Sequence, residues 1–349
     1  MNDTKTSSFH VVRQYGKQGG MENYVWELTH ALVNKGHEVT VICEKVHKNP
    51  DDKINVVELG VIKPKPRWLS QLKFSKRVTD FFEALGSCEN SIIHSHERTA
   101  VHHVTTIHGP SILNRKRKLL DFLSIRLRAW EFLERREVLG SNVLCVLPNS
   151  KMIAQELLEF YPKVERRLCM PAYPGVADNF SSIGEKSVRG TVGFIGREWK
   201  RKGLQIAVSA FKDALEIKPD IRFLVAGMPP EEVSHLFKGL PSDSYELQGW
   251  QKTEDFFSNI NLLTHPALSE PFGMVVAEAN AAHIPVLVST QAGVADLVTD
   301  NNGCVLMPNS IEWPSKMIEL LTWNRKVESM DLSWLALADQ CADVYRKLS

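Results

Sequence analysis

The chain has 349 residues, of which 43% are hydrophobic and 24% are charged. This composition excludes a disordered protein, and the length predicts two domains rather than one core. The net charge is +1, yet residues 1–170 hold 26 Lys and Arg against 19 Asp and Glu, so we expect the first half to meet an anionic partner.

Membrane-spanning and disulfide-rich classes are also excluded by simple patterns. No apolar run approaches the roughly 20 residues that cross a bilayer, and the polar start MNDTKTSS lacks the apolar centre of a signal peptide. The six cysteines form no C-x-x-C pair, so we expect neither a zinc site nor disulfides. Cys43 and Cys145 are interpreted as small core residues. We infer a reduced, cytoplasmic compartment.

Strand and helix patterns alternate along the first half of the chain. Strands are expected at 9–15, 37–44, 54–60, 91–96, 104–108 and 142–148, and helices at 20–35, 69–85, 113–139 and 150–160. The alternation then restarts, with strands at 190–196, 221–227, 245–250, 261–266, 285–289 and 303–307. Helices are expected there at 203–216, 230–239, 253–259 and 292–299, just after Gly273, and at the end of the chain.

Two such series predict two parallel sheets, each covered on both faces. The fold class is therefore α/β, with two doubly wound Rossmann-like domains facing across a cleft. We expect an amino-terminal domain over 1–170 and a carboxyl-terminal domain over 171–330, because turn formers cluster in the stretch PAYPGVADNFSSIGEK. A last helix near 331–349 is able to pack back on the first domain.

Two loops between a strand and a helix are candidates for binding an anion. In YGKQGGMENY, Gly19 and Gly20 allow close backbone approach at a helix start, although an ordinary turn explains the loop equally well. In GREWKRKG, the cations at 197 and 200–202 follow a strand, where open α/β sheets bind ligands. Arg grips phosphate with two hydrogen bonds, so phosphate binding is favoured over a solvated basic loop.

Histidines gather in IIHSHERTAVHHVTTIHGP. His94 and His96 share one face of a strand, as metal-binding pairs do, but no Asp or Cys completes the set. Buried, hydrogen-bonded histidines explain the pattern better, and we predict no metal. His108 ends a strand before a Gly-Pro turn, which suits a contact with substrate.

The segment 111–136 mixes cations with large apolar residues. Its eight Lys and Arg stand at 115–118, 126, 128, 135 and 136, and KPKPRWLSQLKFSKR at 63–77 adds more. A basic amphipathic helix binds an anionic membrane surface, whereas a solvated helix resting on the sheet is the alternative. The charge of the whole first half favours the membrane.

The stretch SEPFGMVVAEANA places two carboxylates around a helix start. Glu270 precedes the turn at Gly273, and Glu278 lies more than one helical turn after it. The helix start favours an anion. A cap and a solvated residue would also explain the pair, but one carboxylate on each side of an anion site suits a nucleotide-sugar, which has hydroxyls at both ends and phosphates between.

These stretches together resemble the retaining glycosyltransferases of family 4, which have the GT-B fold. EPFGMVVAEANA matches the family's E-x7-E pattern, and GREWKRKG matches its Gly-Arg…Lys-Gly element. GGMENYVWELTHALVNKGHEVTVI, VTTIHGP, AYPGVADNF and QAGVADLVTDNNGCVLMP resemble further elements in the family's order. The resemblance covers nearly the whole chain and is strongest to bacterial transferases of the lipopolysaccharide core and of other cell-surface glycans.

The resemblance implies roles for individual residues. Glu270 contacts the donor sugar, Glu278 holds the ribose, and His108 orients the sugar. Arg197 and Lys202 stabilise the diphosphate as charge develops on it, in place of a metal, and no cofactor is needed. The implied catalytic residues are Glu270, His108, Arg197 and Lys202, and the further donor-binding residues are Gly19, Gly20, Gly249, Trp250, Gln251, Phe272, Gly273, Met274, Val275 and Glu278.

The chain departs from the family pattern at three places. Ala282-His283 stand where a Gly is common, Ala177 replaces an acid, and Asp296 replaces a Glu. The expected activity is transfer of a hexose, with retention, from a UDP-sugar to a cell-surface glycan or glycolipid. The expected place is the inner face of the cytoplasmic membrane, and no nucleic acid is involved. A GT-B nucleotide-sugar epimerase and a non-catalytic nucleotide-sugar-binding protein stay open as alternatives.

Overall fold

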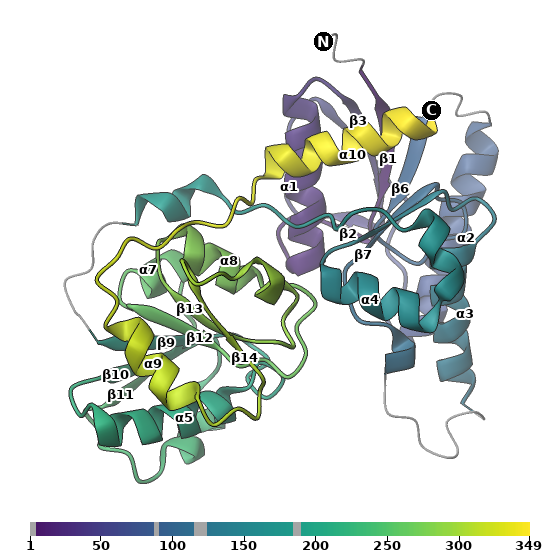
Figure 1. Cartoon of the computed structure of the whole chain (residues 1–349). Coiled ribbons are helices and arrows are strands. Elements are labelled where there is room, and N and C mark those ends of the chain that lie inside the picture. The colour runs from purple at the N-terminus through teal and green to yellow at the C-terminus, as the bar shows by residue number, and fades with distance from the viewer. Residues whose placement is uncertain (1–4, 87–90, 115–123, 184–189) are drawn as a thin grey trace. The chain divides into compact units, whose positions relative to one another are not determined.

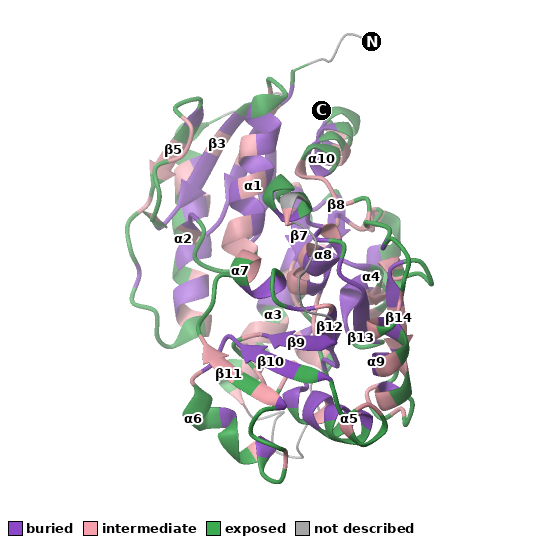
Figure 2. Cartoon of the chain, turned by 90° about the vertical axis from the view of Figure 1, so that its left-hand side faces the viewer, coloured by how far each residue is buried: buried purple, intermediate pink, exposed green. Residues whose placement is uncertain are grey.

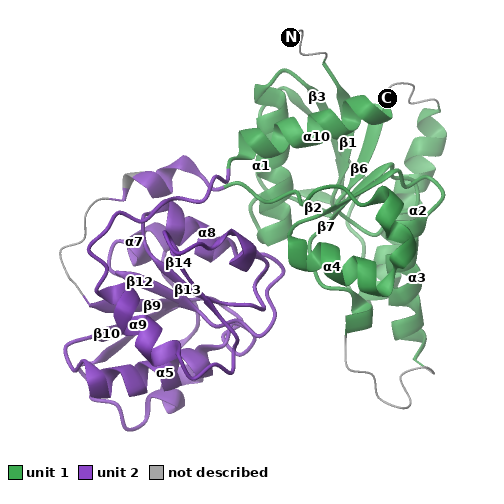
Figure 3. Ribbon diagram, in the orientation of Figure 1, with its two compact units in different colours: residues 1–175, 333–349 green, residues 176–332 purple. Residues whose placement is uncertain are grey.

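The computed structural model describes residues 5–86, 91–114, 124–183 and 190–349. The chain divides into two compact units, drawn in different colours in Figure 3. Unit 1 comprises residues 1–175 and 333–349, and unit 2 comprises 176–332. The boundary between the two units thus lies five residues after the domain boundary expected from the sequence. The last helix belongs to unit 1.

Unit 1 contains one six-stranded parallel sheet in the order β5-β3-β1-β6-β7-β8. Its helices pack on both faces (Figure 1). The strands are β1 (Ser7–Val11), β3 (Glu38–Cys43), β5 (Ile54–Glu58), β6 (Ser91–Ser95), β7 (Val104–Ile107) and β8 (Cys145–Pro148), with a small pair β2 (Gln14–Tyr15) and β4 (Lys45–Val46). The helices are α1 (Gly20–Asn34), α2 (Arg67–Leu85), α3 (Ile125–Leu139), α4 (Lys151–Phe160) and α10 (Trp334–Leu348), with 3-10 turns η1 (Ile112–Asn114) and η3 (Pro162–Arg167).

Unit 2 repeats this architecture with a parallel sheet in the order β11-β10-β9-β12-β13-β14. Its strands are β9 (Thr191–Ile195), β10 (Arg222–Ala226), β11 (Tyr245–Gly249), β12 (Leu262–His265), β13 (Val286–Ser289) and β14 (Gly303–Leu306). Its helices are α5 (Leu204–Ile217), α6 (Pro230–Val233), α7 (Thr253–Phe257), α8 (Met274–Ala281) and α9 (Trp313–Leu321), with 3-10 turns η4 (Asp178–Ser182), η5 (Ser234–Phe237) and η6 (Gly293–Leu297).

The buried residues explain why these segments form a covered sheet. Strands β9, β12 and β13 are buried at every position, and Figure 2 shows them in the colour of buried residues. Such continuous apolar runs are typical of parallel strands with helices on both faces. The sequence prediction of a doubly wound α/β fold is therefore confirmed for both sheets.

The long basic helix expected over 113–139 is wrong in its extent. Residues 112–114 form a 3-10 turn, and α3 begins only after Ser124, whose side chain accepts a hydrogen bond from the Leu127 N–H. Ser is a favoured residue at this capping position, which explains the later start. The cations at 115–118 lie outside the described residues.

One disulfide corrects the expectation from the cysteine spacing. Cys145 and Cys169 are bonded, because Val146 and Leu168 pair as a parallel bridge and the Cys169 N–H donates to the Val146 carbonyl. The two cysteines are 24 positions apart, a spacing that matches no motif in the sequence. The bond also removes the cysteine argument for a reducing compartment.

A residue just after the end of α8 has an unusual backbone conformation. His283 adopts a left-handed conformation with φ 56°, which is the conformation that makes Gly common after a helix end.

None of the helices in the described ranges is long and apolar enough to cross a membrane.

Candidate functional site

The central strands of unit 2 bring two loops to one edge of the sheet. Strand β9 pairs with β12, at the point where the strand order reverses direction. The loop at 196–203 follows β9, and the stretch 266–273 follows β12. Ligands of open α/β sheets bind at the carboxyl ends of the strands beside such a switch point, so the two loops define the candidate site of this unit.

Glu270 is held at this edge by its backbone and by its side chain. Its N–H donates to the Gln291 carbonyl and its carbonyl accepts from Gly293, each at 2.9 Å. The Oε2 atom lies 3.2 Å from Arg201 Nη1, 3.4 Å from Lys202 Nζ and 3.8 Å from His265 Nε2. From the sequence alone, the Glu270 carboxylate could have been a simple helix cap. In the structure it is the centre of a charged cluster.

Two polar atoms of this cluster are buried without a hydrogen bond. Among the described residues, Glu270 Oε2 and His265 Nε2 have none, although both lie within the ion-pair distances given above. Buried polar atoms in proteins are nearly always hydrogen-bonded, so an atom left over in a loop at a sheet edge is suited to receive a ligand hydroxyl.

His265 was not among the residues predicted for the site, and Arg201 was predicted only as one of the cations of the basic loop. Burial, followed by the charges of Lys202 and Arg201, holds the pKa of His265 well below its usual range, so the ring is neutral. Arg201 also donates to the Ser269 carbonyl at 2.5 Å. The sequence carried a signal for both, because His265 ends a strand as His108 does, and Arg201 belongs to the basic loop.

The start of α8 lies between the two carboxylates, as the sequence predicted. Gly273 precedes the helix with φ 107°, a conformation that Gly tolerates, and the helix places Met274 and Val275 in its first turn. Glu278 lies in the same helix, and burial together with Glu254 raises its pKa to about 7, against an opposing effect of Lys202. Lys202 therefore interacts with both carboxylates.

The remaining predicted residues of unit 2 lie on the neighbouring loops. The Arg197 guanidinium stands over the Trp250 ring at 5.6 Å, and Trp250 is 62% exposed. Gly249 ends β11, and Gln251 donates to the Gln248 carbonyl. Phe272 is 4% exposed, and its carbonyl accepts a hydrogen bond from the Val294 N–H at 2.8 Å, so this residue is buried beside the loop.

Gly19, Gly20 and His108 belong to unit 1 rather than unit 2. Both glycines are exposed at the start of α1, and a Cβ at Gly20 would meet no atom within 4 Å. His108 follows β7, where its Nε2 lies 3.1 Å from His96 Nδ1. Burial lowers the pKa of His108 to about 3, so it can orient a hydroxyl but carries no charge.

His94 and His96 are joined by a third histidine that the sequence did not reveal. His10 on β1 is in register with His94 on β6, and one ring nitrogen from each of the three histidines lies within 4.8 Å of the others. Neighbours occupy these rings, since His94 contacts Tyr345 Oη at 2.6 Å and Thr106 Oγ1 at 2.8 Å. The cluster is a hydrogen-bonded network of neutral rings, because burial lowers the pKa of all three.

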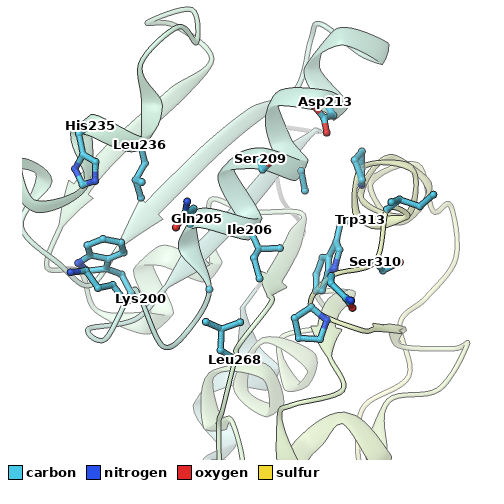
Figure 4. Close-up of a pocket in the computed structure, with 17 residues that line it drawn as sticks. Lys200, Gln205, Ile206, Ser209, Asp213, His235, Leu236, Leu268, Ser310 and Trp313 are labelled. Atoms are coloured by element: carbon cyan, nitrogen blue, oxygen red, sulfur yellow. The ribbon is translucent and has the colours of Figure 1, made fainter. Parts of the chain in front are cut away.

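A separate cavity of about 940 Å³ lies on unit 2 beside α5. Figure 4 shows Gln205, Ser209 and Asp213 along this helix, facing Trp313. Lys200 and Leu268 line it from the same two loops that carry Arg197 and Glu270, but no predicted donor-binding residue does. The cluster around Glu270 is therefore distinct from this cavity.

Two family models match the chain. The model for glycosyltransferase family 4 matches residues 18–179, and the model for glycosyl transferases group 1 matches residues 189–322. Each model falls almost entirely on one of the two units, and between them they cover most of the chain.

Curated relatives match at low identity over nearly the full length. An uncharacterized glycosyltransferase of Methanocaldococcus jannaschii is 24% identical, with 94% of each chain covered. A D-inositol 3-phosphate glycosyltransferase of Corynebacterium aurimucosum is 21% identical, covering 95% of this chain and 91% of its own.

Solved structures share the fold at still lower identity. WaaG, a glycosyltransferase involved in lipopolysaccharide biosynthesis, superimposes with a TM-score of 0.74 at 17% identity, covering 96% of this chain and 95% of its own. Anabaena HepE in complex with UDP gives 0.69 at 16% identity, covering 98% and 100%. The chain therefore belongs to the glycosyltransferases of GT-B fold, with a family 4 domain followed by a group 1 domain.

Proposed function

We propose that the protein is a retaining glycosyltransferase that moves a hexose from a UDP-sugar to a cell-surface glycan or lipopolysaccharide-core acceptor. The observation that carries the proposal is the cluster of Glu270, Lys202 and His265 at the switch point of unit 2, next to the start of α8. Structural neighbours support the proposed substrate class, because HepE has been solved with UDP and with UDP-glucose, and WaaG is involved in lipopolysaccharide biosynthesis.

The donor contacts follow from the charges. The helix start of α8 and the cations Arg197 and Lys202 suit the diphosphate. Glu278, as a carboxylate, accepts hydrogen bonds from ribose hydroxyls, and Glu270 accepts from the sugar. Arg201, which lies 3.2 Å from Glu270, orients that carboxylate. His108, with its neutral ring, and the exposed backbone of Gly19 and Gly20 are proposed contacts for sugar and phosphate within unit 1.

The proposed reaction breaks the bond between the anomeric carbon and the diphosphate oxygen, and both electrons leave with the diphosphate. The acceptor hydroxyl forms the new bond on the same face, and its proton passes to a departing phosphate oxygen. Arg197 and Lys202 stabilise the charge that develops on the leaving group, the kind of contribution that is often the largest in catalysis. All of these steps use side chains and substrate alone.

A surface of α3 supports the membrane-associated part of the proposal. Ile125 is 72% exposed and Phe132 is 57% exposed, and Arg126 and Arg128 are exposed on the same helix. Exposed apolar groups among cations are typical of proteins that bind anionic lipid surfaces. We place the enzyme at the inner face of the cytoplasmic membrane.

The test combines donor binding, transfer and stereochemistry. In a thermal-shift panel of UDP-, GDP- and ADP-sugars, the true donor at 100 times its dissociation constant adds about 2.7 kcal/mol of stability. Glu270→Gln should lower transfer by at least about 100-fold, a loss comparable to that from removing one stabilising group at a reaction centre. The matched control Glu232→Gln, an exposed carboxylate of unit 2, should leave transfer unchanged.

Three results would contradict the proposal. An inverted anomeric linkage in the product, measured by NMR, would exclude retention. Conversion of the donor without any acceptor would favour an epimerase. Donor binding without transfer, across a panel of glycan acceptors, would favour a binding protein.

A further inference from the structure

A cavity of about 460 Å³ lies in unit 1 between the end of α3 and η3. We call it the α3–η3 cavity, and its lining residues are Phe132, Arg135, Arg136, Leu139, Gly140, Lys163 and Arg167. None of the residues assigned to donor binding belongs to it. Its lining is cationic at four positions and contains no carboxylate.

None of the four cations forms a salt bridge with an acidic side chain of the described residues, although the charge of Glu137 acts on Arg136. The two buried carboxylates of α3 are occupied elsewhere, because Glu137 pairs with Arg98 at 3.1 Å and Glu134 lies 3.8 Å from the same guanidinium. The carboxylate of Glu156 on the nearby α4 accepts hydrogen bonds from the Ser111 N–H and from the Asn114 side chain. Among the described residues, the positive charge of the cavity is therefore only partly balanced, by the charge of Glu137 acting on Arg136.

Arg136 shows this imbalance most clearly. Its Nη2 donates to Ser75 Oγ at 2.8 Å and to the Arg98 carbonyl at 2.9 Å, which are both uncharged acceptors. Its Nε is buried and has no hydrogen-bond partner among the described residues. Burial lowers the pKa of Arg136, against an opposing effect of Glu137. Because Glu137 is already paired with Arg98, the partly buried charge of Arg136 is poorly compensated, which is unfavourable.

The end of helix α3 explains only part of the cluster. A helix C-terminus carries a charge of roughly −0.5 and attracts cations, and Arg167 Nη1 donates to the Gly140 carbonyl at 2.8 Å in this way. Four full positive charges exceed that half charge, so a surplus remains. An anion with several oxygens, such as phosphate, matches a cavity lined by three Arg and one Lys.

The apolar surface beside the cavity indicates where the phosphate comes from. Phe132 lines the cavity and is 57% exposed, and Ile125 is 72% exposed seven residues earlier in the same helix. Residues seven apart lie on one face of a helix, so two exposed apolar side chains share the face of α3 that reaches the cavity, with the exposed Arg128 between them. We propose that the α3–η3 cavity binds a phosphate group, supplied by the headgroup of a membrane lipid.

Only the lipid source rests on the proposed membrane-associated function. Phosphate binding is measured without donor or acceptor, by calorimetry with inorganic phosphate and by sedimentation with phosphatidylcholine vesicles that contain or lack phosphatidate. Failure of this site and failure of glycosyl transfer are therefore separate outcomes. We expect binding to inorganic phosphate and to the phosphatidate vesicles. We expect little binding to phosphatidylcholine alone, because its phosphate is a diester whose charge is neutralised by the choline group.

Matched variants locate the site. Arg135→Gln and Lys163→Gln should each weaken phosphate and vesicle binding by about tenfold, since a hydrogen bond to a charged group is lost, and Lys163→Arg should retain it. Arg166→Gln removes the same charge from an exposed residue of η3 that does not line the cavity and should change affinity less than about twofold. Because Arg135, Lys163 and Arg166 are exposed, the variants should unfold at the temperature of the unaltered protein.

Distinct results overturn the two parts of the proposal. If neither inorganic phosphate nor phosphatidate vesicles bind, or if Arg166→Gln weakens binding as much as Arg135→Gln, the cavity is not a phosphate site. If inorganic phosphate binds and the vesicles do not, a lipid is not the source.

Discussion

Glu278 is the residue at which the pH dependence of stability and of donor binding should have opposite signs. Its pKa is raised to about 7, mainly by burial, above the usual value of about 4.3. When the pKa of a carboxyl is higher in the folded protein than in the unfolded chain, its contribution to stability is fully present below the pKa of the unfolded chain. This contribution is lost as the pH rises through the pKa of the folded protein. The same rise creates the carboxylate that we assign to the ribose hydroxyls, which binds them more strongly than the neutral acid does.

Glu278→Gln isolates this group, because the amide does not titrate. Between about pH 5 and pH 8, the unaltered protein should lose stability relative to the variant, as measured by urea unfolding, while its affinity for UDP should rise relative to the variant. Glu97 and Glu137 also have pKa values of about 7, but they are present in both proteins and cancel in the comparison. Parallel pH profiles for the two proteins would refute this assignment.

The start of α8 is the element on which the candidate site depends. A Cβ at Gly273 would lie 3.2 Å from Val294 Cγ1, and φ is 107°. Gly273→Ala should therefore lower the free energy of unfolding by about 1–2 kcal/mol, and it should weaken donor binding by displacing the first turn. Urea unfolding and thermal shift with UDP measure the two effects.

Gly20→Ala at the start of α1 is the matched control. Its Cβ would meet no atom within 4 Å, and Ala favours a helix over Gly by about 1 kcal/mol, so its stability should be unchanged or slightly raised. A Gly273→Ala variant as stable as this control would show that the left-handed turn before α8 is not required.

The sequence predicted helices and strands correctly where hydrophobic periodicity and the residues at strand ends indicate them. It predicted the structure less well where contacts between distant segments determine it. The order of strands and helices, and Glu270 beside a helix start, follow from local pattern. The helix predicted from the sequence was longer than α3, because the start of α3 depends on the Ser124 cap. The Cys145–Cys169 disulfide and the place of His10 beside His94 come from strand pairing, which a single sequence does not specify.

At the scale of the whole molecule, the end of the chain completes the core of unit 1. The buried side chains of α10 are Leu337, Ala338, Cys341, Ala342 and Tyr345, which belong to the same apolar cluster as α1 and the sheet. Tyr345 also reaches His94 at 2.6 Å. Burying a large apolar side chain contributes about 1.5–3 kcal/mol, so these contacts are comparable to the total stability of a domain, about 5–15 kcal/mol.

Truncation after Leu332 should therefore unfold unit 1 and spare unit 2. In hydrogen exchange measured by mass spectrometry, the amides of β1 and β6 should lose protection while those of β9 and β12 keep it, because α10 has no part in the core of unit 2. The control Lys35→Gln removes only the ion pair between Lys35 and Asp339, which is partly exposed and should contribute less than about 1 kcal/mol. If β1 stays protected in the truncated protein, the core of unit 1 does not need α10. Loss of protection in both units would instead mean that the two sheets unfold as one cooperative body.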